Sequence, residues 1–79
     1  MEKEIIPLNL LPIGRVGKVI RLDAKGATRR RMLDLGLVNN TEVEAITKSP
    51  SGDPTAYQIR GAVIALRSEE ASRVFVSLN

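Results

Sequence analysis

The sequence contains no cysteine and no histidine among its 79 residues. The absence of thiols and imidazoles excludes disulfides, zinc sites of the usual kind and thiol nucleophiles, and it removes the commonest general base. Only carboxylates remain as ligands for iron or zinc, and their spacing does not indicate a site. We therefore predict no bound metal and no cofactor. The carboxylates considered are Glu42, Glu44, Asp53, Glu69 and Glu70.

Aromatic side chains and long apolar runs are also scarce. With one Tyr, one Phe and no Trp, the core must be aliphatic, and little is left for stacking on nucleic-acid bases. The longest uncharged run, residues 5–14, contains two prolines and is too short to cross a bilayer. Residues 1–4 are not the basic start of a signal peptide. We expect one soluble, cytosolic domain over residues 1–79, without membrane insertion.

Charge is distributed unevenly along the chain. The net charge is +3, but residues 15–31 hold seven basic residues and one acid, whereas the chain from residue 42 onward holds four basic and five acidic residues. A basic segment of this kind indicates an acidic partner surface or a phosphate backbone. The alternative is an ordinary solvated face.

The clearest local pattern is a short helix that ends at a glycine. At 100° per residue, Thr28, Met32 and Leu35 share one side, which predicts an apolar stripe. Gly36 can adopt the left-handed conformation that ends a helix, and Leu37 can then pack back onto the last turn. A helix this short is unstable alone in water, so it must pack against another part of the protein.

Three consecutive arginines belong to this helix. Arg29 and Arg31 flank the apolar stripe, and Arg30 lies opposite it, where Asp34 is four residues away and can pair with it across solvent. The aliphatic stems can cover the edges of the stripe while the guanidinium groups stay in water. The three side chains are therefore a solvated face or a docking patch.

The rest of the chain predicts short strands. The expected strands are residues 18–22, 42–47, 57–59, 63–66 and 74–78, with a further short strand at 7–9. Residues 63–66 are apolar on both faces, which favours a central position. Closing such short strands into a barrel would remove their exposed edges. The fold class is therefore mainly β, a small barrel of about five strands with one short helix and one helical turn.

Turn chemistry separates these strands. Gly14 and Gly17 bracket an early turn, and Asn40 can take a positive φ where glycine would be easier. Residues 49–54 form a polar hairpin loop in which Asp53 bonds nearby backbone N–H groups. Residues 60–61, Arg-Gly, fit a tight two-residue turn. Ser68 is expected to cap the helical turn that precedes the last strand.

Four of these motifs together resemble the FeoA family, the small cytosolic proteins of bacterial ferrous iron uptake. They are the helix at residues 29–37, the turn at 49–54, the Arg-Gly turn at 60–61, and the strand and acidic helical turn at 65–71. The resemblance extends over nearly the whole chain and implies an SH3-like barrel. Two departures are Asn39-Asn40, where the family usually has Pro-Gly, and the lack of His and Cys in a family often described as binding transition metals.

The resemblance also implies a function. It indicates an accessory or regulatory protein that binds the cytosolic, GTPase-bearing part of the FeoB transporter, and through it reaches the inner face of the membrane. No activating constellation indicates an enzyme. The residues expected to contact the partner are Arg29, Arg30, Arg31, Leu37 and Asp53.

Two alternatives remain open from the residues themselves. Residues 13–20 are similar to the opening of small ribosomal barrels, and the arginines add charge for phosphates. The chain could therefore be a nucleic-acid-binding barrel, although the few aromatics argue against it. A related alternative is the regulatory barrel of a metal-dependent repressor, but no helix-turn-helix accompanies it here.

Overall fold

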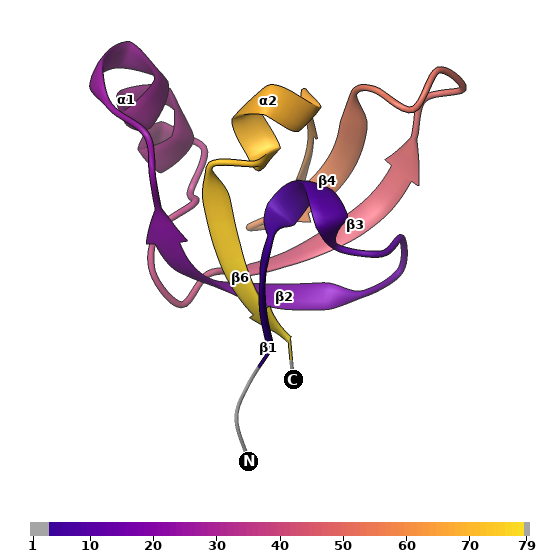
Figure 1. Ribbon diagram of the computed structural model, residues 1–79, viewed down its shortest axis with the longest axis horizontal. Helices are drawn as coiled ribbons and strands as arrows, with labels where there is room; N and C mark the ends of the chain where they lie inside the picture. Colours follow the sequence, from indigo (N-terminus) through magenta and orange to yellow (C-terminus); the bar gives the residue numbers. More distant parts are fainter. Residues whose placement is uncertain (1–3, 79) are drawn as a thin grey trace.

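The computed structural model describes residues 4–78, which form strands around a small core with three short helical segments (Figure 1). The sequence prediction of a mainly β protein with a short helix and a helical turn is confirmed. The strands are β1 (Glu4–Pro7), β2 (Val16–Leu22), β3 (Glu42–Lys48), β4 (Thr55–Ile59), β5 (Ala62–Leu66) and β6 (Val74–Leu78). The helical segments are the 3₁₀ helix η1 (Leu8–Leu10), α1 (Gly26–Asp34) and α2 (Ser68–Ala71).

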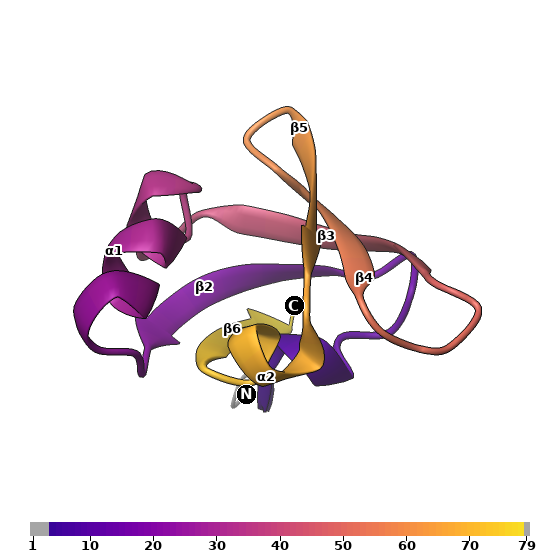
Figure 2. The same ribbon diagram turned by 90° about the horizontal axis from the view of Figure 1, so that it is seen from above.

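All neighbouring strands pair antiparallel, in the order β1-β6-β2-β3-β4-β5. The register shifts after Val19 in β2 and after Ala45 in β3. Such bulges bend a strand and increase its twist, and the sheet accordingly curves around the core (Figures 1 and 2). Within residues 4–78, β1 and β5 each pair with one neighbour only. The expectation that pairing would close the barrel and remove every edge is therefore wrong.

Two strand predictions are corrected by this topology. The short strand expected at residues 7–9 lies earlier, at Glu4–Pro7, and the chain then turns into η1. This turn places Leu8 in the core with no exposed surface. The strand at 63–66 is not central, because β5 is the last strand in the pairing order and the side chain of Val63 is 64% exposed. The run of apolar residues in β5 therefore does not indicate a strand that is buried on both faces.

The core is aliphatic apart from one tyrosine, as the composition predicted. Tyr57 is 1% exposed, and its hydroxyl donates to the carbonyl oxygen of Leu8 over 3.4 Å. Burial raises the pKa of Tyr57 above the usual 10.0, because the charged phenolate is poorly solvated there. Its neighbours in the core are Leu8, Leu11, Val19, Met32, Leu37, Val43, Ala45, Ile59, Leu66, Ala71, Val74 and Val76.

Gly17 lies inside β2 and not in the expected turn. Its neighbour across the sheet is β6, and a Cβ built at position 17 would lie 2.8 Å from Cγ2 and 2.9 Å from Cβ of Val76. This glycine is therefore needed for the close approach of β2 and β6, whereas Gly14, with φ +88°, belongs to the turn that precedes β2.

Helix α1 ends as the sequence predicted. Gly36 has φ +99°, its N–H donates to the Leu33 carbonyl over 3.0 Å, and the Leu37 N–H donates to the Met32 carbonyl over 3.1 Å. This bond pattern is a Schellman motif. The predicted apolar stripe is narrower than expected, because Thr28 is exposed and Met32 is the buried residue of α1.

Two further turns also follow the predicted chemistry. Asn40 adopts a positive φ of 75°. Arg60 and Gly61 have φ of 51° and 80°, so both central residues of the β4–β5 turn are left-handed. Two positive φ values in a two-residue loop match the twist of the flanking strands, which explains the tight hairpin.

Candidate docking surface at the two helices

The two α-helices lie at the same end of the molecule, together with the loop between β3 and β4 (Figure 1). This end carries the three arginines of α1 and the acidic residues of α2. In the sequence these segments are far apart and show no sign of contact. Their side chains contact one another, and this decides which of them remain available to a partner.

The three arginines of α1 have different surroundings. Arg29 donates from Nη1 to the carbonyl oxygen of Leu22, at the end of β2, over 3.0 Å. Arg31 forms an ion pair with Glu70 of α2. Arg30 is exposed, and among residues 4–78 it has no ion pair; the expected pair with Asp34 is not formed. The prediction that all three guanidinium groups simply extend into solvent is therefore corrected for Arg29 and Arg31.

Glu70 connects the two helices. One of its carboxylate oxygens pairs with Arg31, and the other accepts the backbone N–H of Arg67 over 3.1 Å. The second bond satisfies an N–H at the start of α2, which has no partner inside the helix. The residue at the cap position is Arg67, and Ser68 is already helical. The expected capping role of Ser68 is therefore wrong. The N–H groups at the start of α2 are accepted instead by two carboxylates, those of Glu70 and Asp53.

Asp53 is the second of these carboxylates. Its Oδ1 accepts the backbone N–H of Ser68 over 2.8 Å and the Ser68 hydroxyl over 3.3 Å. The expectation that Asp53 bonds N–H groups of its own turn is therefore corrected, because its partner is fifteen residues away. Asp53 is half-buried and holds the β3–β4 loop against α2, so it is a structural contact within the chain.

Leu37 is also corrected as a partner contact. Its side chain has no exposed surface and belongs to the same core cluster as Met32. The Schellman motif directs it there, since the hydrophobic contact that accompanies this motif is made with the preceding turn. Leu33, near the end of α1, is the exposed leucine of this region, with 38% of its surface accessible.

We call the outer surface of α1 formed by Arg29, Arg30 and Leu33 the α1 face. With Gly26 and Asp34 these residues line a shallow hollow of about 410 Å³. Leu33 is not among the residues that the sequence predicts as partner contacts. Helical spacing could have identified it, because Leu33 follows Arg29 by four residues and Arg30 by three, which places it between them on the same side.

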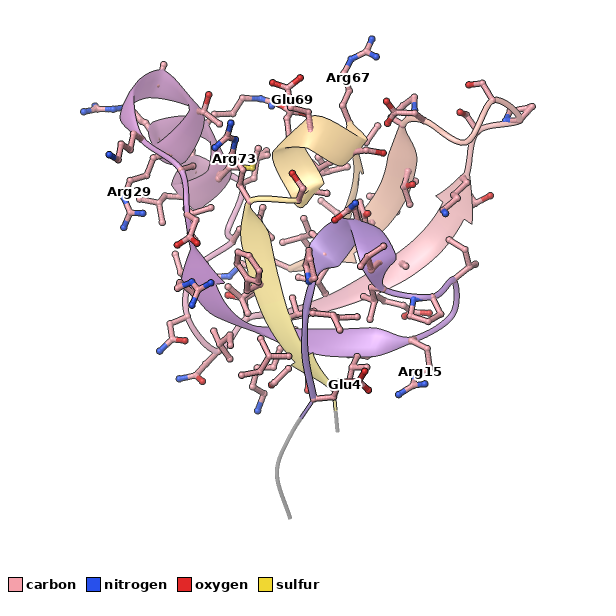
Figure 3. All side chains as sticks on the ribbon, in the orientation of Figure 1. Glu4, Arg15, Arg29, Arg67, Glu69 and Arg73 are labelled. Atoms are coloured by element: carbon pink, nitrogen blue, oxygen red, sulfur yellow. The ribbon has the colours of Figure 1, made fainter. Side chains whose placement is uncertain are left out.

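A larger cleft of about 770 Å³ separates the start of α1 from α2. In Figure 3 the side chain of Arg73 lies between the two helices, and Arg67 extends away from the body of the protein near Glu69. Three cations and three carboxylates line the cleft, so it has no dominant charge. Its lining is Leu22, Asp23, Ala24, Lys25, Thr28, Arg67, Glu69, Glu70 and Arg73.

The basic segment of residues 15–31 does not form one continuous patch. Arg15 lies at the opposite end of the molecule from Arg29 (Figure 3). Arg21 forms an ion pair with Asp23 over 3.1 Å, and its guanidinium carbon lies 4.3 Å from the centre of the Phe75 ring. The cations that remain together are those of α1 and of the adjacent cleft.

The carboxylates of residues 4–78 are not gathered into groups of three that could hold a metal ion. Each of the two best placed, Asp53 and Glu70, already accepts a backbone N–H at the start of α2. Within the same range, no helix has the length and apolar character needed to span a membrane.

Replacing Asp53 with Asn should lower the free energy of unfolding by about 1 kcal/mol. The amide oxygen can still accept the Ser68 N–H, so the loss is that of the negative charge at the start of α2, which is worth up to about 1 kcal/mol. Chemical denaturation of the two proteins checks the value. Asp34→Asn, the same change at an exposed aspartate without an ion pair in residues 4–78, is the matched control with an expected change below about 0.5 kcal/mol. Equal stability of Asp53→Asn and wild type would show that the negative charge of Asp53 contributes nothing at this helix start.

Comparison with known proteins then identifies relatives of the chain. The family model described as the FeoA domain matches residues 6–78. A curated relative, the Fe(2+) transport protein A/Fe(2+) transporter FeoB fusion protein of Porphyromonas gingivalis, is 30% identical over 71 residues. That match covers 90% of this chain but 8% of the relative. The chain thus spans a small part of the curated relative's length.

Solved structures agree with the family match. The FeoA-like protein of Clostridium acetobutylicum superimposes with a TM-score of 0.87 at 37% identity, over 99% of this chain and 90% of that one. FeoA of Stenotrophomonas maltophilia, described as an SH3 domain protein and complexed with zinc, has a TM-score of 0.79 at 32% identity, over 96% and 89%. The predicted SH3-like fold is confirmed.

One more distant likeness concerns the repressor alternative. A manganese-dependent transcriptional repressor superimposes with a TM-score of 0.85, over 100% of this chain and 44% of that one. Its sequence is 19% identical, so this likeness shows a shared fold alone.

Proposed function

Because the chain belongs to the FeoA family, we propose that it is an accessory or regulatory protein of bacterial ferrous iron uptake. In this role it binds the cytosolic, GTPase-bearing part of an FeoB-type transporter. It acts in the cytoplasm and reaches the inner face of the membrane through this partner. It works as a binding module and not as an enzyme.

The observation that carries the proposal is a relative in which transport protein A and the FeoB transporter are fused in one chain. In the Porphyromonas gingivalis protein, a segment similar to this chain is joined to an FeoB transporter. Joining two modules in one chain keeps them at a high effective concentration, which favours modules that act together. The same association is therefore proposed for this chain.

The α1 face is the proposed contact with the transporter. Arginine is enriched at protein interfaces, and the exposed Leu33 adds apolar area beside the two arginines. Arg30 is the arginine proposed to contact the partner most directly, because the guanidinium groups of Arg29 and Arg31 already bond Leu22 and Glu70. The proposed counterpart on the transporter is an acidic surface, since the exposed groups of the α1 face are cationic.

Reversing the charge of Arg30, as Arg30→Glu, should lower the affinity for the transporter's cytosolic part roughly fivefold to tenfold, or about 1 kcal/mol. Stability should change by less than about 0.5 kcal/mol, because the side chain is exposed. The affinity difference should shrink as salt is raised, since exposed charges are screened. Calorimetric titration at two salt concentrations measures both quantities.

Arg15→Glu is the matched control for this experiment. It makes the same change of charge at an exposed arginine at the far end of the molecule (Figure 3). We expect it to reduce the affinity less than twofold or so, because long-range effects between exposed charges are screened beyond about 10 Å. Equal losses in the two variants would mean that only net charge matters, and the α1 face would then not be the contact.

Nucleic acid is not expected as a partner. The two aromatic side chains are occupied, because Tyr57 is buried and the Phe75 ring is covered by the Arg21 guanidinium. Stacking on unpaired bases therefore has no platform in these residues. Binding to arbitrary duplex DNA that Arg30→Glu and Arg15→Glu weaken equally would instead favour a phosphate-binding barrel.

A further inference from the structure

Strand β5 presents an edge of the sheet that no other strand of residues 4–78 covers. It is the last strand in the pairing order and bonds β4 on one side only. Figure 2 shows the turn end of β5 standing out from the rest of the fold, away from α2, while the other end of the strand leads into α2. The paired register runs from Ile59 opposite Ala62 to Thr55 opposite Leu66, without a shift.

The hydrogen-bonding groups on this edge belong to Val63 and Ala65. In a hairpin with a two-residue turn, the residues next to the turn, Ile59 and Ala62, form a bonded pair, and bonded pairs then alternate along the strands. Ala62, Ile64 and Leu66 therefore bond β4. The N–H and C=O groups of Val63 and Ala65 point outward, ready to pair with another strand.

Natural proteins usually protect an exposed edge, and β5 lacks the usual devices. These are a proline, an inward charge, a lysine in the strand or a bulge that twists the edge away. The five residues of β5 are all apolar, and its pairing with β4 is regular, whereas β2 and β3 each carry a register shift. The side chain of Val63 is also 64% exposed beside the free edge.

The charges at the two ends of β5 indicate what can pair with it. Arg60 precedes the strand and Arg67 follows it, seven residues apart, and neither forms an ion pair within residues 4–78. The stem of Arg60 rests on Gly36 at the end of α1, and Arg67 also borders the cleft between α1 and α2. Both side chains are long and exposed and flank β5 in the sequence, so carboxylates at the two ends of an added strand can reach them, which favours an acidic segment.

A second copy of the chain fits this edge poorly. If β5 paired antiparallel with β5 of another molecule, Arg60 of one copy would lie near Arg67 of the other at both ends of the pair. Like charges at neighbouring cross-strand positions are destabilising. The distribution of charge thus selects against self-pairing and in favour of a different partner.

We infer that the free edge of β5 binds an extended segment of a partner protein by strand addition, a segment with an apolar centre and an acidic residue at each end. Main-chain bonds to Val63 and Ala65 supply the affinity, and the exposed Val63 side chain and the two arginines supply selectivity. The assignment of this segment to the transporter rests on the function proposed above, whereas the argument for strand addition at the β5 edge is independent of it.

A peptide tests the edge directly. The probe is acetyl-Asp-Thr-Val-Thr-Val-Thr-Val-Asp-amide, whose acids are spaced like the two arginines. Added to ¹⁵N-labelled protein, it should slow hydrogen exchange of the Val63 and Ala65 amides about tenfold or more, with smaller changes at Ala62 and Ile64, which already bond β4. The same peptide with lysine at both ends should bind at least about tenfold more weakly.

Two variants complete the test. Val63→Glu places a negative charge beside the edge that repels the acidic peptide and should abolish the protection, while Val16→Glu, at an exposed valine of β2, should leave it unchanged. If the acidic peptide protects neither amide in the wild-type protein, the inference is overturned. Protection that appears without peptide, together with a dimer in sedimentation, would overturn it in favour of a second copy.

The transporter's cytosolic part is the second probe, and it separates this inference from the proposed function. Protection of Val63 and Ala65 by this probe would support the assignment of the segment to the transporter. Binding that calorimetry detects but that leaves both amides exchanging freely would keep the proposed function and contradict this assignment.

Discussion

Replacing Gly17 with Ala is expected to lower the free energy of unfolding by about 1–3 kcal/mol, the usual cost of overpacking a core. The added methyl group would lie 2.8 Å from Cγ2 and 2.9 Å from Cβ of Val76, which is fully buried. A Cβ atom cannot rotate away, so β2 and β6 must separate instead. For a domain of this size the melting temperature should fall by roughly 5–20 °C. Thermal unfolding measures it.

Val76→Ala separates this clash from other effects of the substitution. It removes Cγ2 but keeps Cβ, so it relieves one of the two close contacts. The double variant Gly17→Ala/Val76→Ala should therefore be more stable than the sum of the two single losses predicts, with a coupling of about 0.5 kcal/mol or more. Strict additivity, or an unchanged melting temperature for Gly17→Ala, would show that the strands do not approach this closely.

Replacing Gly36 with Val should cost a similar amount, about 1–3 kcal/mol, for a different reason. Gly36 has φ +99°, a conformation that a β-branched residue adopts only with strain. The new side chain would also meet Cδ of Arg60 at 2.9 Å. Since the arginine stem can move, the strain in the backbone should account for most of the loss. Denaturant unfolding of the variant gives the value.

Gly52→Val is the matched control for Gly36. Gly52 has a similar φ of +89° but no atom within 4 Å of a Cβ at that position, and it lies in an exposed loop. The loop can relax, whereas Gly36 is held by the two bonds that end α1. We therefore expect a smaller loss at Gly52. Equal losses would mean that the helix end adds no constraint beyond the backbone conformation of a single residue.

Local features of this fold follow from the residues at each position. A glycine after an amphipathic segment predicts the end of α1, and Arg60-Gly61 between two apolar runs predicts the β4–β5 hairpin. Asn40 likewise takes the positive φ that its side chain tolerates. In each case the preference depends on one or two neighbouring residues and is therefore visible without the fold.

The candidate docking surface was less predictable. The three arginines of α1 stand out in the sequence, but Arg31 is neutralised by a glutamate 39 residues later, and Asp53 is occupied by a serine 15 residues later. Nothing in the local pattern indicates such partners. Leu37 is equally ambiguous, because an apolar residue after a helix can pack inward or remain exposed for a partner.

The sequence alone therefore determined the strand-rich class, the turns and the helix end, since these depend on backbone preferences and on the alternation of apolar residues. The order of strands, and with it the free edge of β5, came from the tertiary structure. An apolar strand is compatible with the centre or the edge of a sheet, and long-range pairing selects between them. The same pairing brings α1, α2 and the β3–β4 loop to one end, and so decides that Arg30 stays exposed while Arg31, Leu37 and Asp53 serve the fold.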